Sequence, residues 1–90
     1  MSASSEAIVQ LPVDVDLHAR PAARFVRMAM GFESSVRIAA GEREADAKSL
    51  LAVLALGARR GATLRLRADG DDASVAVDAL ASRIATLQEL

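Results

Sequence analysis

Cysteine, tryptophan and tyrosine are absent from this chain of 90 residues, and histidine occurs only once. Without cysteine there can be no disulfide framework and no thiolate metal site, which is compatible with a reducing compartment. One histidine among scattered carboxylates lacks the spacing of a metal-binding set, so we expect no metal ion and no other cofactor. No nucleophile stands paired with a general base, so an independent enzyme is not expected either.

The chain also lacks a strong net charge and long apolar runs. Its formal net charge of −1 gives no overall attraction to nucleic acid or to anionic membranes, so electrostatic recognition must come from local patches. Phe25 and Phe32 lie on or just after a predicted helix, whereas a small nucleic-acid binder would place aromatic residues on exposed strands. With no transmembrane run and no secretory signal pattern, we expect a cytoplasmic protein that does not insert into membranes.

The length predicts one small domain. At this size a chain buries only roughly 60–65% of its unfolded surface, and with 52% hydrophobic residues but so few aromatics the core must consist of Ala, Val, Leu and Ile. Residues 1–6 are polar and are expected to form a disordered leader. Residues 7–90 are expected to form the domain, which we predict to be a monomer.

Hydrophobic periodicity predicts four strands and three helices. The strands are expected over 7–13, 36–40, 43–46 and 63–68, and the helices over 19–30, over 50–56 and from 73 onward. Each strand offers one apolar face and each helix one apolar stripe, so the order β-α-β-β-α-β-α indicates one sheet with all helices on a single face. The predicted class is therefore α+β, an open-faced β-sandwich.

Several residues mark where these elements end. Pro12 suits an edge strand because it cannot donate a hydrogen bond to a neighbour. Gly31 and Gly57 are expected to end the first two helices, and Gly31 can take the left-handed conformation. Ser49 and Asp72 are expected to cap the second and third helices. The third helix then presents an apolar stripe, formed by Val77, Leu80, Ile84 and Leu87.

The single histidine, His18, lies where a connector gives way to the first helix. Pro21 is tolerated only in a first turn, so it places the helix start within a residue or two of His18. A helix start gathers free backbone N–H groups and the positive end of the helix dipole, so Ala19, Arg20 and Pro21 form an anion-binding turn. A lone histidine is often only a surface or capping residue. Here a nucleophilic imidazole beside a guanidinium that can fork onto phosphoryl oxygens predicts a phosphohistidine site.

The helix that follows His18 is amphipathic. Arg20, Arg24 and Arg27 fall on one face without an acidic residue among them, and the spacing of about 100° per residue makes them a continuous basic stripe. A charge stripe is usually only a solvated face, but this one starts at the histidine and suits phosphate or an acidic partner. The apolar face opposite is expected to comprise Ala22, Phe25, Val26, Ala29 and Met30.

Two segments resemble the same family. The stretch Leu17-His18-Ala19-Arg20-Pro21-Ala22-Ala23-Arg24-Phe25-Val26 is similar to the active-site segment of HPr, the histidine phosphocarrier of the bacterial phosphoenolpyruvate:sugar phosphotransferase system. The stretch from Ala47 to Gly57 resembles the regulatory-serine region of that family, and the separation of His18 from Ser49 also fits.

The resemblance implies a fold and a relay. It implies an antiparallel sheet of strand order 1-4-2-3. It also implies that His18 takes phosphate at its δ (pros) nitrogen from enzyme I, charged by phosphoenolpyruvate, and passes it to an enzyme IIA-type acceptor. Asp16 departs from the pattern, because the family usually has glycine before the Leu-His pair. Either the loop bends differently there, or the carboxylate points away from the phosphate.

The same resemblance implies a docking surface beside the histidine. We expect Leu50 and Leu51 to be the more exposed members of an apolar patch. The full predicted surface comprises Arg24, Arg27, Lys48, Leu50, Leu51 and Leu54.

An alternative function acts through Ser49. Phosphorylation of Ser49 by an HPr kinase, or binding of a transcriptional regulator there, would make the chain a regulatory interaction module rather than a carrier. A His18→Ala substitution separates the two, since only the module would keep its partner binding.

Overall fold

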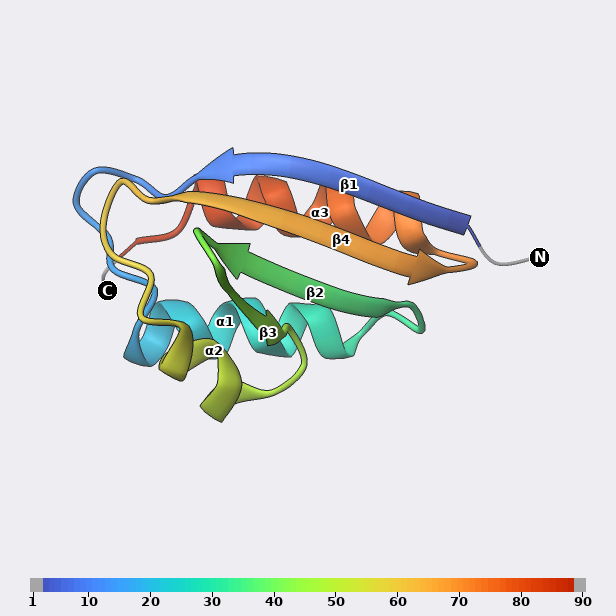
Figure 1. Cartoon of the computed structure of the whole chain (residues 1–90), viewed down its shortest axis with the longest axis horizontal. Coiled ribbons are helices and arrows are strands. Elements are labelled where there is room, and N and C mark those ends of the chain that lie inside the picture. Colours follow the sequence, from blue (N-terminus) through green and yellow to red (C-terminus); the bar gives the residue numbers. More distant parts are fainter. Residues whose placement is uncertain (1–2, 89–90) are drawn as a thin grey trace.

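The computed structural model describes residues 3–88. Its four strands form one antiparallel sheet in the order β1-β4-β2-β3, and the helices lie on one side of it (Figure 1). This arrangement confirms the predicted class, element order and strand order. The strands are β1 (Ala3–Gln10), β2 (Ser35–Ala40), β3 (Arg43–Asp46) and β4 (Thr63–Gly70); the helices are α1 (Ala19–Met30), α2 (Leu50–Leu56) and α3 (Ala73–Ala85). Within residues 3–88 no helix has the length and apolarity needed to cross a membrane.

The first strand begins earlier than predicted. Ala3 pairs with Gly70 and Glu6 with Arg67, because β4 extends far enough to give the polar segment hydrogen-bonding partners. The expectation of a disordered leader is therefore wrong for residues 3–6, while residues 1 and 2 lie outside the described part. Strand β1 also ends at Gln10, before Pro12, and it forms an edge of the sheet as predicted.

The core fills the space between the sheet and the helices. In β4, Leu64, Leu66 and Ala68 are buried while the residues between them are exposed, which is the alternation that one covered face requires. The predicted stripe along and just after α3 is fully buried. Phe25 of α1 is also fully buried and is the largest of the buried side chains.

Two expectations at the end of α1 are wrong. Met30 is 64% exposed; eight residues after Ala22 it lies about 80° from that residue around the helix, at the margin of the apolar face. Gly31 has a φ of −77° and donates its N–H to the Met28 carbonyl, so the helix ends in a right-handed turn. Gly57, by contrast, ends α2 as predicted, and it does so in a left-handed conformation with a φ of 68°.

Asp72 precedes α3 but does not cap it through its side chain. Its carboxylate instead accepts hydrogen bonds from the backbone N–H groups of Glu33 and Ser34, each at 2.9 Å, and from the Ser34 hydroxyl. The carboxylate therefore joins the loop before β2 to the start of α3. Strand β4 continues to Gly70, two residues beyond its predicted end at residue 68.

These contacts predict a pH dependence of folding. The hydroxyl of Ser34, followed by the N–H of Glu33, holds the pKa of Asp72 below its ordinary value of 3.8. A pKa that is lower in the folded state contributes stability above the unfolded value, and this contribution is lost as the pH falls through the folded value. We expect the free energy of unfolding to fall less steeply between about pH 5 and pH 2 in Asp72→Asn than in the unaltered chain.

Urea titrations followed by far-ultraviolet circular dichroism would measure this slope. Asp78→Asn is the matched control, because Asp78 is exposed on α3, the helix that follows Asp72, and its side chain makes no hydrogen bond or ion pair within residues 3–88. Equal slopes for both variants would contradict the assignment to Asp72.

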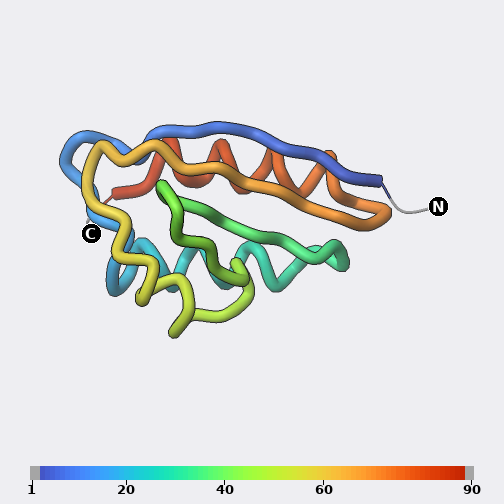
Figure 2. Tube along the Cα trace, viewed as in Figure 1, coloured from blue at the N-terminus to red at the C-terminus, as the bar shows by residue number. Residues whose placement is uncertain are grey.

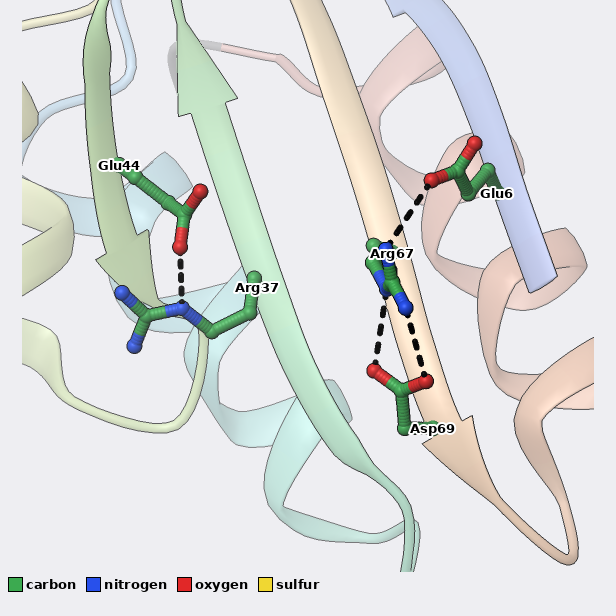
Figure 3. Close-up of polar contacts among 5 residues, drawn as sticks. All are labelled: Glu6, Arg37, Glu44, Arg67 and Asp69. Atoms are coloured by element: carbon green, nitrogen blue, oxygen red, sulfur yellow. Dashed lines mark hydrogen bonds and ion pairs between the residues drawn. The ribbon is translucent and has the colours of Figure 1, made fainter. Parts of the chain in front are cut away.

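The face of the sheet away from the helices carries paired charges. Arg37 contacts Glu44 at 2.8 Å, and Arg67 lies between Asp69 at 3.2 Å and Glu6 at 3.7 Å (Figure 3). The hydrogen bond from Arg67 lowers the pKa of Asp69. Exposed pairs of this kind stabilise a fold only slightly. Because these charges already have partners, this face is a weak candidate for binding an anion.

Candidate functional site

His18 is the residue that precedes α1, and its ring is accessible. Its backbone is extended, with φ −142° and ψ 161°, and its backbone N–H donates to the Asp16 carbonyl at 2.9 Å. The side chain is exposed and makes no capping hydrogen bond to the helix. The imidazole is therefore not consumed by a structural role and is open to reaction.

The first turn of α1 is tightly bent after His18. Ala19 has a φ of 46°, the sole positive φ of a non-glycine residue within residues 3–88. This conformation costs an L-residue roughly 1–2 kcal/mol. Pro21, buried two residues later, adds a fixed φ to the turn. The N–H groups of Ala19 and Arg20 belong to the first turn, whose donors have no partner within the helix.

His18 lies on a small depression formed by the loop before α1, the loop after α2 and Leu54 of α2. Its volume is about 180 Å³, and its lining residues are Asp16, Leu17, His18, Leu54, Gly57, Ala58 and Arg59. Arg59 was not anticipated from the sequence. It follows α2 in a loop with no periodicity, and nothing in the local pattern indicates that this loop lies beside His18.

The loop before α1 and the loop after α2 run side by side, as Figure 2 shows for residues 11–18 and 57–62. Backbone hydrogen bonds join them along their length. They run from Leu11 N–H to the Ala62 carbonyl at 2.9 Å, from Gly61 N–H to the Pro12 carbonyl at 3.0 Å, and from Leu17 N–H to the Ala58 carbonyl at 3.0 Å. The two loops thus position the histidine together.

Asp16 takes part in the same connection. Its Oδ1 accepts the backbone N–H of Arg60 at 2.7 Å and lies 3.8 Å from the Nε of the Arg60 guanidinium. The Asp16 carboxylate is thus held by the loop after α2, and Asp16 also lines the depression beside His18.

The basic stripe of α1 is exposed as predicted. Arg20 and Arg27 make no side-chain hydrogen bond or ion pair within residues 3–88. Arg24 and Arg27 line a shallow hollow of about 380 Å³ with Met28 and with Arg83 of α3. Arg83 thus adjoins the stripe, a neighbour that only the packing of α3 on α1 reveals.

Helix α2 presents the predicted serine and leucines. The Ser49 Oγ accepts the N–H of Ala52 at 3.2 Å, which confirms the cap. Leu51 is 80% exposed and Leu50 40% exposed, while Leu54 is half-buried, so the predicted order of exposure is confirmed. Lys48, which was also predicted to belong to the docking surface, is engaged elsewhere. Its Nζ donates a hydrogen bond to the Phe32 carbonyl at 2.6 Å, so its ammonium group is held at the loop after α1.

Comparison with known proteins decides the family. Residues 5–86 match the family model described as PTS HPr component phosphorylation site. The chain belongs to the HPr family. It is 39% identical over 80 residues to the phosphocarrier protein HPr of Haemophilus influenzae, covering 89% of this chain and 94% of that protein. The family is therefore that of a phosphocarrier rather than a metabolic catalyst.

Other relatives agree in sequence and in structure. The crystal structure of HPr from Bacillus anthracis superposes with a TM-score of 0.86 at 32% identity, covering 91% of this chain and 98% of that one. A multiphosphoryl transfer protein of Xanthomonas campestris is 47% identical over 57 residues, which are 63% of this chain and 7% of that protein. An HPr-like segment thus also occurs inside a much longer protein.

Proposed function

We propose that this HPr-family protein accepts a phosphoryl group on Nδ1 of His18 from enzyme I charged by phosphoenolpyruvate, and passes it to an enzyme IIA-type acceptor in the cytoplasm. The observation that carries this proposal is the exposed imidazole of His18, free of any capping bond, at the start of α1 and two residues before Arg20.

The transfer needs a lone pair on the histidine ring and groups that compensate the negative charge of the phosphoryl oxygens. Nδ1 of neutral His18 attacks phosphorus, and the bond from phosphorus to the carrying atom of enzyme I breaks, with its electron pair staying on that atom. The reverse exchange, with the acceptor as nucleophile, discharges His18. Because the negative charge is spread over three oxygens, catalysis rests on positioned donors. Arg20 and the N–H groups of the first turn supply them.

The surface beside His18 also supports the carrier function. Leu50 and Leu51 form an exposed apolar patch on α2, and α2 packs against α1, whose stripe of guanidiniums is exposed. An apolar centre bordered by arginines suits a partner whose contact surface is apolar and acidic. Enzyme I and the acceptor would meet this one surface in turn.

The test is incubation with enzyme I and phosphoenolpyruvate. We expect an acid-labile, alkali-stable phosphate on the unaltered chain and none on His18→Ala. Arg20→Ala should keep the fold but accept phosphate about 10- to 100-fold more slowly. Absence of label on the unaltered chain, or persistent label on His18→Ala, would refute the carrier function.

The regulatory function of Ser49 stays a separate prediction. A phosphate on Ser49 would add roughly two negative charges at the start of α2, next to the exposed leucines. It would then repel an acidic partner from the docking surface. A regulator that still binds His18→Ala with unchanged affinity would favour this second function.

A further inference from the structure

We infer that Arg59, and not Arg20 alone, contacts the phosphoryl group on His18, and that Asp16 positions it there. The inference rests on the proposed function of His18 and adds a residue to it. Arg59 lines the depression onto which His18 opens, although the two residues come from different loops.

The guanidinium of Arg59 is available for this role. Its side chain is exposed and makes no hydrogen bond or ion pair within residues 3–88. The other arginine of the loop, Arg60, is engaged with Asp16. Within the described depression, Arg59 is thus the one permanent cation among the lining residues.

The charge balance of the depression calls for such a cation. A phosphoryl group on histidine brings about two negative charges, and the Asp16 carboxylate in the lining is already paired with Arg60. A single guanidinium can fork onto two of the three phosphoryl oxygens. Arg20 from α1 and Arg59 from the second loop would together match the charge of the group.

Asp16 determines where Arg59 lies. Its Oδ1 holds the backbone N–H of Arg60 at 2.7 Å, one residue after Arg59. On the other side of Arg59, the Ala58 carbonyl accepts the N–H of Leu17 at 3.0 Å. Arg59 is therefore bracketed by two bonds to the residues that directly precede His18. Where the family usually has glycine, the Asp16 carboxylate supplies the first of these bonds and is itself neutralised by Arg60.

Steady-state transfer from enzyme I, with this chain as the varied substrate, tests the role of Arg59. We expect Arg59→Ala to lower kcat about tenfold with little change in KM, the loss being modest because the site is open to water. Arg59→Lys should recover part of the rate. Arg37→Ala, which removes the same charge from the opposite face, should transfer at the unaltered rate.

A double-mutant cycle tests the positioning by Asp16. Asp16→Gly should slow transfer in the unaltered chain but have little further effect once Arg59 is alanine, because the two residues would act through one contact. Circular dichroism would verify that each variant folds. If Asp16→Gly slows transfer by the same factor in the unaltered chain and in Arg59→Ala, the positioning role of Asp16 is refuted.

The outcomes separate the two proposals. Arg59→Ala with unchanged kcat, or with a rise in KM alone, would overturn the contact between Arg59 and the phosphoryl group while leaving His18 as the carrier. Failure of the unaltered chain to accept phosphate would overturn both.

Discussion

Replacing Phe25 with alanine is expected to lower the free energy of unfolding by about 3–5 kcal/mol. Phe25 is fully buried in α1, in a core otherwise built from aliphatic side chains. The substitution removes the favourable free energy of burying the phenyl ring. It also leaves a cavity that the small neighbouring side chains fill poorly. A domain of this size has only about 5–13 kcal/mol of net stability, so a large part of it would be lost.

The measurement is chemical unfolding followed by far-ultraviolet circular dichroism, since the chain has no tryptophan or tyrosine to report by fluorescence. Phe32→Ala is the matched control, because Phe32 is only half-buried at the edge of the core. We expect it to cost less than half as much. Similar losses for both variants would show that Phe25 is not the centre of the packing.

Gly70→Ala is expected to cost roughly 3 kcal/mol or more. Gly70 has a φ of 148°, a conformation that L-residues rarely adopt. A Cβ there would lie 2.5 Å from the Oγ and 2.8 Å from the Cα of Ser34, so the backbone of that residue would have to move. The shift would also strain the hydrogen bonds from Ser34 to Asp72.

Gly61→Ala provides the comparison. Its φ of 74° is also positive, but a Cβ there would meet nothing within 4 Å. Gly61→Ala should therefore lower the free energy of unfolding by only about 1 kcal/mol, the cost of placing an L-residue at this φ. The difference between the two variants isolates the close approach of β4 to Ser34. If Gly70→Ala unfolds no more easily than Gly61→Ala, that approach is not a constraint.

The local sequence pattern predicted the structure correctly where the interacting residues lie within one helix. The bounds of α1 and α2, the cap at Ser49 and the buried stripe of α3 depend on residues three or four positions apart, and each prediction was confirmed. The exposure of Leu50 and Leu51, by contrast, was predicted from the family resemblance and not from the local pattern.

The local sequence pattern gave wrong predictions where a segment distant in the chain supplies the hydrogen-bonding partner. Residues 3–6 have a polar composition typical of a free end, yet β4 provides a strand for them to pair with. Asp72 has the residue type of a helix cap, yet Glu33 and Ser34 offer its carboxylate three donors. In both cases tertiary hydrogen bonds outweighed the local preference.

The residues alone determined that the histidine stands at a helix start beside Arg20, because His18, Arg20 and Pro21 are neighbours in the chain and a helix start is a local structure. Tertiary structure decided what surrounds it. Asp16 and Arg60 are 44 residues apart, and Arg59 reaches the depression beside His18 only because hydrogen bonds draw two loops together. Such a contact depends on the packing of α1 and α2, and no periodicity within either segment encodes it.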